Sequence, residues 1–224
     1  MKKIIASALF VVLLGCQSQN INETLTPIQN EPVKISSKVG VIKADPNYIF
    51  PSEVGYTWNY DVVYHPTDDP YVDYNGTYTL SVEKSRKNST ETVINLRAID
   101  TVNTEYFFPT LTITKNNISV TGVTYLGFGA DKAEDLKTDF LHLPMKTGDK
   151  WDDGLWLGET KKLEKVTIPS GTFDAWKVSV IGTYNQAYTA VGDFWITPNI
   201  GIIKCNLSVP GWTFESTLTS AAKK

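Results

Sequence analysis

The sequence predicts an all-β protein, either an antiparallel β-sandwich or a half-open barrel of meander hairpins. Three observations lead to this fold class. Aromatic residues make up 12% of the 224 residues, and threonine and valine are abundant, which suits pleated strands better than helices. Short segments in which apolar and polar residues alternate recur along most of the chain. Turn-forming residues, with 15 Gly and 11 Pro in all, separate these segments.

The first strands are expected soon after Tyr48, where the β-rich domain begins. Apolar residues alternate with polar ones across residues 78–82 and again across residues 94–98. A period of two gives a strand one buried face and one wet face. We therefore expect a half-buried strand in each place.

Two turn segments predict hairpins. Asn116 and Asn117 separate two short alternating segments, and asparagine tolerates a positive φ, which suits a two-residue turn. Pro210 and Gly211 separate the apolar strand that ends at Val209 from the aromatic residues that follow it. Strands joined by such short turns form an antiparallel meander.

One segment departs from the strand pattern. Across residues 130–141, Ala133, Leu136 and Phe140 recur at helical spacing, and acidic residues occupy the other faces. This pattern predicts at most one short amphipathic helix, or an ordered loop, in this part of the chain.

Charge and length limit the classes of function. The formal net charge is −3 and the isoelectric point is about 5.4. The chain therefore has no overall positive field with which to bind a phosphate backbone, and nucleic acid is not expected as a partner. The length fits a single β-rich domain over residues 48–220.

The N-terminal residues have the layout of a secretory signal peptide. Lys2 and Lys3 precede an apolar run from Ile4 to Leu14, which is the usual order of a positive segment and an apolar segment. This run is too short to span a membrane, since a spanning helix needs about 20 apolar residues. We therefore expect export rather than insertion.

The end of this run resembles the lipobox of bacterial lipoproteins, because Leu13 and Gly15 precede Cys16. The resemblance implies that residues 1–15 are cleaved and that Cys16 is acylated, which would hold the mature protein to a membrane of the bacterial cell envelope. The next residue is Gln rather than Asp, which implies the outer membrane in diderm bacteria. Residues 16–47 are polar, contain prolines and show no sustained period, so we expect the lipidated cysteine to be followed by a flexible tether.

The C-terminal half carries a second resemblance. Residues 166–178 include the turn V-T-I-P-S-G-T-F, and residues 194–204 read F-W-I-T-P-N-I-G-I-I-K. Together with the prolines, glycines and tryptophans before them, these segments resemble a diffuse group of uncharacterised bacterial secreted and lipid-anchored proteins. The likeness covers residues 51–204 and implies one β-rich domain without specifying its chemistry.

No set of residues predicts catalysis. The two histidines, His65 and His142, are expected in a surface loop and in a turn or strand edge, and no G-x-S-x-G motif is present. The Cys, His and acidic residues lack the spacing of a zinc or calcium site. Cys205 is the remaining thiol if Cys16 is acylated, and its place on the apolar face of an alternating strand predicts burial. We therefore expect no catalytic residue, no metal and no cofactor.

An apolar tip is the candidate recognition surface. Trp156 lies between Leu155 and Leu157 in a segment bounded by glycines, which favours exposure. Tyr125 and Phe128 belong to a second Gly-rich aromatic segment and complete the predicted surface for a ligand or partner. The alternative is that these loops fold back over the core.

These observations predict a lipid-anchored envelope protein that is not an enzyme and serves as an interaction or structural module. The alternative is a carrier or binder of an apolar or carbohydrate ligand in a barrel-like cavity. The expected partners are the membrane, through acylated Cys16, and either another envelope protein or a small apolar or sugar ligand.

Overall fold

The computed structural model describes residues 50–67, 73–100, 106–107, 110–121, 137–154, 156–184, 187–209 and 211–223. Within these residues the chain forms one antiparallel sheet of 13 strands. The strands are β1 (Tyr56–Pro66), β2 (Tyr74–Lys87), β3 (Glu91–Asp100), β4 (Tyr106–Phe107), β5 (Thr110–Thr114), β6 (Asn117–Thr121), β7 (Lys137–His142), β8 (Lys150–Asp152), β9 (Trp156–Ile168), β10 (Gly171–Tyr184), β11 (Ala187–Thr197), β12 (Gly201–Val209) and β13 (Trp212–Lys223).

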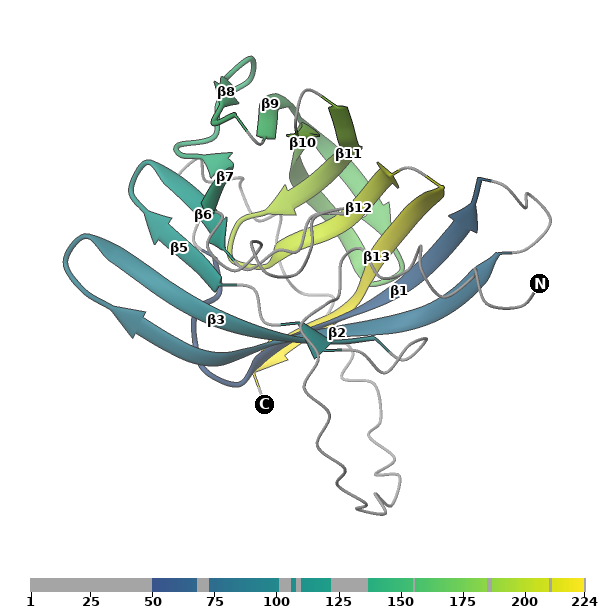
Figure 1. The fold of residues 1–224 in the computed structure, drawn as a ribbon. Coiled ribbons are helices and arrows are strands. Elements are labelled where there is room, and N and C mark those ends of the chain that lie inside the picture. Colours follow the sequence, from purple (N-terminus) through teal and green to yellow (C-terminus); the bar gives the residue numbers. More distant parts are fainter. Residues whose placement is uncertain are drawn as a thin grey trace.

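The strand order is β7-β6-β5-β3-β2-β1-β13-β12-β11-β10-β9-β8, with the short β4 paired to β3 beside this path. Two meanders, one on each side of the β1–β13 pair, therefore make up the sheet. Figure 1 shows that the sheet curves into a half-open barrel, in which β9 to β12 arch over the half that contains β1 to β3. The predicted all-β, antiparallel fold of meander hairpins is confirmed.

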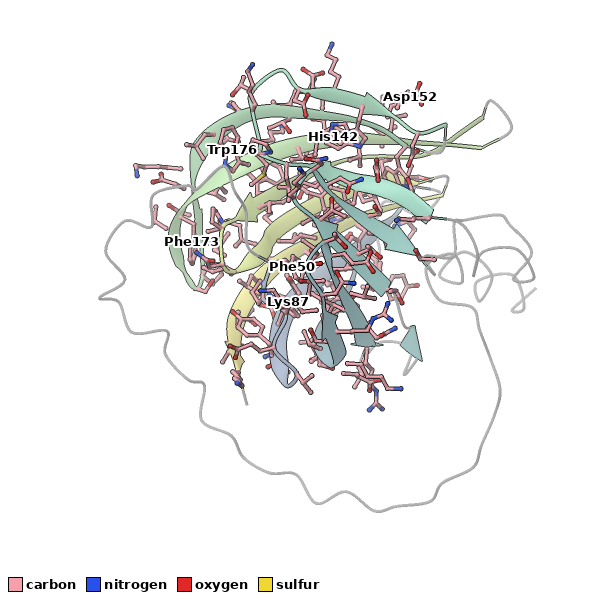
Figure 2. The ribbon with its side chains drawn as sticks, turned by 90° about the vertical axis from the view of Figure 1, so that its left-hand side faces the viewer. Phe50, Lys87, His142, Asp152, Phe173 and Trp176 are labelled. Carbon is pink, nitrogen blue, oxygen red and sulfur yellow. The ribbon has the colours of Figure 1, made fainter. Side chains whose placement is uncertain are left out.

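Alternating side chains fill the inside of this barrel. One connected cluster of buried apolar residues runs through both meanders, and Phe50 belongs to it. Figure 2 shows Phe50 among the strands and Asp152 at the periphery. Full burial of one large aliphatic or aromatic side chain contributes about 1.5–3 kcal/mol. The largest fully buried side chains are Trp58, Ile94, Ile118, Leu141, Met145, Ile196, Ile203 and Leu218.

The prediction of a short helix or ordered loop is wrong for residues 137–141, because these residues belong to strand β7. Strand β6 supplies the backbone partners, and an irregularity in its register lies between Ile118 and Ser119. Thr138 and Leu141 are both buried, so the irregularity changes the spacing of buried residues from two to three, which resembles a helical period. Residues 130–136 lie outside the described residues. No helix in the described part is long and apolar enough to cross a membrane.

Both predicted hairpins are present, but the first turns differently from the expectation. Neither Asn116 nor Asn117 has a positive φ, and Asn117 already belongs to β6. Thr114 Oγ1 instead accepts hydrogen bonds from both backbone N–H groups, each at 3.1 Å. The β12–β13 hairpin does use a glycine, since Gly211 has a φ of 90°. Hydrogen bonds to the Thr114 side chain therefore stabilise the first turn, whereas the second turn depends on the positive φ that glycine allows.

Cys205 is buried and free, as predicted. Its side chain belongs to β12 and faces the core. Burial, followed by the nearby charge of Asp193, raises the pKa of the Cys205 thiol far above its ordinary value. A thiol that stays protonated is a poor nucleophile, so this residue has the packing role of a small apolar side chain.

Candidate functional site

A groove of about 400 Å³ lies where β8, β9 and β10 run side by side. Its floor includes the aliphatic side chains of Leu157 and Ile181, and charged and polar groups surround them. The lining residues are Lys150, Trp151, Asp152, Leu157, Gly158, Glu159, Lys161, Ser179 and Ile181. An apolar floor with a few placed polar groups is typical of small-ligand sites.

Strand alternation places the groove on the outer face of the sheet. On β10, Val178 and Val180 are buried in the core, whereas Ser179 and Ile181, which alternate with them, point the other way and line the groove. The pairing register then aligns the outer residues across three strands. Asp152 pairs with Leu157, and Leu157 pairs with Ile181.

A second row lies two residues further along the same strands, about 7 Å away. Lys150 pairs with Glu159, and Glu159 pairs with Ser179. An irregularity in the β9–β10 register follows at once and leaves Lys161 without a direct partner on β10. Along its length the groove therefore changes from a row with Leu157, Ile181 and the carboxylate of Asp152 to a charged row that contains both lysines.

Glu159 joins the two lysines of this charged row. Its Oε2 atom lies 2.6 Å from Lys161 Nζ and 3.8 Å from Lys150 Nζ. The hydrogen bond from Lys161, and then the charge of Lys150, hold the pKa of Glu159 below its ordinary value. The carboxylate is therefore ionised at neutral pH and offsets part of the positive charge.

The structure places Trp156 and Leu157 on opposite faces of β9. Leu157 lines the outer groove, whereas Trp156 packs against the core cluster. These two neighbours therefore cannot form one continuous surface. Leu155, Tyr125 and Phe128, which complete the predicted recognition surface, lie outside the described residues, as does Cys16. The role of all these residues stays a prediction.

The remaining groove residues were not predicted from the sequence. Ile181 comes from β10, 24 residues after Leu157 in the chain, and only the strand register brings the two together. Lys150 and Lys161 belong to an ordinary mixture of charges in the sequence. The alternation around residues 178–181 could have marked Ile181 as outward-facing, but not as a neighbour of Leu157.

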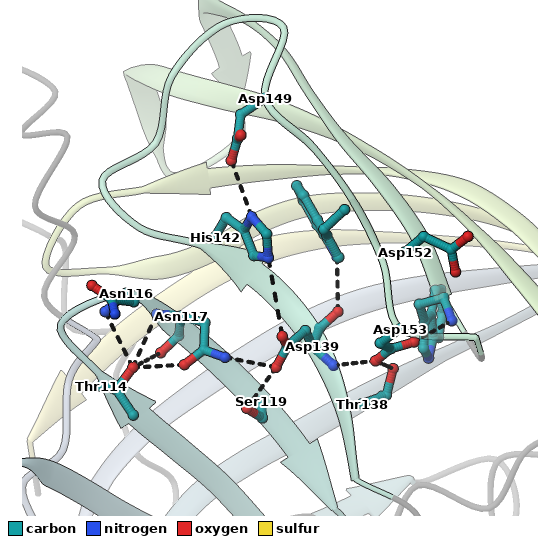
Figure 3. Close-up of polar contacts among 12 residues, drawn as sticks. Thr114, Asn116, Asn117, Ser119, Thr138, Asp139, His142, Asp149, Asp152 and Asp153 are labelled. Atoms are coloured by element: carbon teal, nitrogen blue, oxygen red, sulfur yellow. Dashed lines mark hydrogen bonds and ion pairs between the residues drawn. The ribbon is translucent and has the colours of Figure 1, made fainter.

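A polar cluster lies beside the groove, where the two edge strands β7 and β8 meet (Figure 3). The described residues show no backbone pairing between these strands. Asp153 instead accepts hydrogen bonds at Oδ2 from the Thr138 hydroxyl and the Asp139 N–H, both at 2.6 Å. Trp151 Nε1 donates to the Asp139 carbonyl at 2.9 Å. We name this β7–β8 contact, made by Thr138, Asp139, Trp151 and Asp153, the seam.

His142 lies against the seam, between two carboxylates. Its ring stacks on Trp151, with centroids 4.8 Å apart. Its Nδ1 atom lies 3.2 Å from Asp149 Oδ2, and its Nε2 atom lies 4.0 Å from Asp139 Oδ2. The nearby hydroxyl of Ser119 donates to Asp139 rather than to His142, so the order of a nucleophile–histidine–acid set is not formed.

Metal ligation finds no support in the described part of the chain, where no three His, Cys, Asp or Glu residues gather to hold an ion. His65, the other histidine, forms an exposed contact of 2.6 Å with Asp73. Asp68 and Asp69, which lie between His65 and Asp73 in the sequence, are outside the described residues.

Comparison with solved structures shows that the fold is shared with an exported protein. A crystal structure described as an exported protein with a YmcC-like fold, from Bacteroides fragilis, superposes with a TM-score of 0.52 at 15% identity, over 79% of this chain and 100% of that one. A protein described as a lipoprotein from Parabacteroides distasonis gives 0.48 at 11% identity, over 79% and 99%. A LolA superfamily protein from Nitrosomonas europaea gives 0.27 at 6% identity, over 80% and 90%.

The Bacteroides fragilis likeness shows that the barrel of this chain recurs in an exported protein. At this level of identity it shows the fold alone. Neither a protein-family model nor a curated protein matches the sequence. The chemistry must therefore be argued from the residues of the groove.

Proposed function

We propose that this chain is a lipid-anchored protein of the bacterial cell envelope that binds a ligand or partner without catalysing a reaction. The observation that carries the proposal is the groove over β8 to β10, which combines a floor of Leu157 and Ile181 with lysines and carboxylates at its rim. The interior of the barrel is a packed cluster, so the groove is the better-supported contact surface.

The signal peptide and lipobox support the anchored part of the proposal. Acylation of Cys16 followed by a tether would keep the barrel near a membrane while leaving the outer face of its sheet accessible. Replacing Cys16 by Ser is expected to release the protein from the membrane fraction and to remove the mass of the acyl groups. If the Cys16→Ser variant stays in the membrane fraction and its mass is unchanged, the prediction of a lipid anchor is contradicted.

Photo-crosslinking in cells tests the binding surface. A photo-reactive amino acid at position 157 of the anchored protein is expected to give a defined adduct, identified by mass spectrometry. The matched control is position 163 on the same strand, because Leu163 is 44% exposed and does not line the groove. Equal labelling at both positions, or none at position 157, would contradict the proposal.

A second candidate function is a carrier of an apolar ligand within the barrel. Two pairs of aromatic side chains favour it. The ring centroids of Tyr64 and Phe214, and likewise those of Phe140 and Phe194, lie 5.2 Å apart. All four side chains pack against the core and are only partly buried. Solvent extraction of the purified chain followed by mass spectrometry tests it. A recurrent lipid whose binding survives substitution of Leu157 would favour the interior over the groove.

A further inference from the structure

The groove has a direction, because its aliphatic side chains and its two lysines lie in different rows of the strand register. Leu157 on β9 and Ile181 on β10 are aliphatic neighbours in one row. Val191 on β11 pairs with Ile181, is 49% exposed and continues this row. Three neighbouring strands span about 10 Å. The outer face therefore offers an aliphatic strip that begins in the groove and extends beyond it.

The charged row carries an excess of positive charge. Lys150 and Lys161 share one carboxylate, that of Glu159. The next carboxylate along the row, that of Asp193, accepts from the Ser179 hydroxyl and is paired with Lys177 at 2.8 Å, so Glu159 alone faces the two ammonium groups of the groove. The side chains of these lysines are 72% and 42% exposed. An ammonium group has three N–H donors, so both lysines keep donors for an anion after contacting Glu159.

Asp152 completes the direction of the groove. It lies in the same row as Leu157 and Ile181, at the end formed by β8, and its side chain accepts a hydrogen bond from the Gly154 N–H at 2.8 Å. A carboxylate at this end repels an anionic group and leaves the lysine row as its favourable position. A ligand with one anionic end and one aliphatic end therefore fits in a single orientation.

We propose that the groove binds a small amphiphile that has a single anionic head group, held by Lys150 and Lys161, and an aliphatic tail lying on Leu157, Ile181 and Val191. This inference rests on the proposed function and names its ligand class. A volume of about 400 Å³ lies at the low end of the range of about 300–1,000 Å³ for small-ligand sites. That size is sufficient for a small amphiphile.

Calorimetric titration of the chain without residues 1–16 tests the inference, since this form keeps every described residue. The probes are decanoate below its micellar concentration, the uncharged decanol and the tail-less acetate. Decanoate is expected to bind at least about tenfold more tightly than either of the others. Decanol binding as tightly as decanoate would overturn the role of the lysines, and acetate doing so would overturn the role of the strip.

Two charge variants give opposite expected results. Lys161→Gln is expected to weaken decanoate binding about tenfold without changing decanol binding. Glu159→Gln is expected to tighten decanoate binding, because it frees both lysines from their shared carboxylate. Lys165→Gln is the control, since Lys165 lies on the same strand but pairs with Asp174 at 2.9 Å and does not line the groove. Weaker decanoate binding to Glu159→Gln would overturn the inference, because a purely structural ion pair predicts that loss.

The two proposals can fail separately. If decanoate does not bind but position 157 crosslinks to another molecule in cells, the amphiphile is wrong and the binding groove stands. An acidic peptide that binds more tightly than decanoate would likewise replace the amphiphile by a protein segment. If position 157 gives no adduct and decanoate does not bind, both proposals are wrong.

Discussion

The two meanders of the barrel meet in two places that are built in different ways. Along one junction, β1 and β13 pair through eleven residue pairs, from Tyr56–Lys223 to Pro66–Trp212. At the seam, β7 and β8 meet through the side chains of Thr138, Trp151 and Asp153. The first junction is a continuous backbone ladder with one shift of register, between Asn59 and Tyr60, and the second is a set of individual side-chain contacts.

The difference predicts different responses to substitution. Ladder hydrogen bonds join backbone groups that every residue except proline carries, so the β1–β13 junction is sensitive mainly to changes in the core beneath it. The seam depends on the identity of single polar side chains. The seam also holds β8 in place, and β8 forms one wall of the groove. Substitutions at the seam are therefore expected to change the shape of the binding surface.

The largest effect is expected beneath the β1–β13 junction. Trp58 is fully buried, and its ring lies 5.2 Å from that of Phe50 and 4.8 Å from that of Tyr56. Trp58→Ala is expected to lower the free energy of unfolding by about 4 kcal/mol, through lost burial and the cavity left behind. Chemical denaturation measures it. Val54→Ala is the control, because Val54 is 55% exposed. A loss below about 1 kcal/mol would show that Trp58 is not central to the core.

The next effect is expected where the seam meets β9. A Cβ added at Gly158 would overlap the ring of Trp151, whose indole N–H donates a hydrogen bond to the Asp139 carbonyl. Gly158→Ala is therefore expected to cost about 2 kcal/mol through overpacking. The double variant with Trp151→Leu checks the cause, because the smaller side chain relieves the overlap. If the two costs are simply additive, the ring of Trp151 is not the origin of the loss.

The sequence was sufficient to predict the fold class because alternation and turn residues are local signals. Residues 78–82 and 94–98 lie in β2 and β3 as predicted. The error at residues 137–141 has a local cause as well, since the irregular register opposite Ile118 spaces the buried residues of β7 by three. A strict period of two was therefore absent from the sequence there.

The site was less predictable because it depends on register. Leu157 could be selected from its apolar, Gly-bounded segment, but the same signal grouped it with Trp156, which lies on the other face. Nothing local links Leu157 to Ile181, and nothing in the sequence around Asp153 indicates that its carboxylate caps the backbone of β7. Contacts between distant strands follow from pairing, which a single sequence does not display.

A smaller effect is expected at Tyr60, on the β1 side of the ladder junction. Its hydroxyl donates to the Ile202 carbonyl at 2.9 Å, so Tyr60→Phe is expected to cost about 1 kcal/mol at neutral pH. Burial, followed by the charge of Tyr78, raises the pKa of Tyr60 well above its ordinary value. Denaturation as a function of pH measures both effects.

The sign of the pH dependence follows from this raised pKa. Tyrosine in the unfolded chain titrates near pH 10, whereas folded Tyr60 keeps its proton at higher pH. The stability from neutral Tyr60 is therefore intact below about pH 10 and falls as the pH rises above it, because the folded state then binds more protons than the unfolded one. The Tyr60→Phe variant is expected to fall less steeply in that range. Parallel curves would contradict the raised pKa.

The smallest change in the free energy of unfolding is expected at the seam, together with a change in hydrogen exchange that is confined to β7. Asp153 is exposed, so Asp153→Asn is expected to lower the free energy of unfolding by less than about 1 kcal/mol. Its carboxylate nevertheless accepts from the Asp139 N–H at Oδ2 and from the Trp156 N–H at Oδ1. An amide keeps one acceptor oxygen, and its nitrogen at Oδ2 would face the Asp139 N–H with donors of its own; exchange that became faster at Trp156 instead would show the opposite orientation of the amide. Hydrogen exchange is expected to become faster at Asp139, while the amides of the β1–β13 ladder keep their protection.

Asp152→Asn provides the matched control for this comparison. Asp152 is the exposed neighbour of Asp153, and its carboxylate accepts from Gly154 rather than from β7. It is therefore expected to leave exchange at Asp139 unchanged. If both variants open β7 equally, the effect comes from lost negative charge rather than from the Asp153 hydrogen bonds. If neither does, the seam is held by the Trp151 indole and its stacking on His142, and one carboxylate does not decide whether the edge strands stay together.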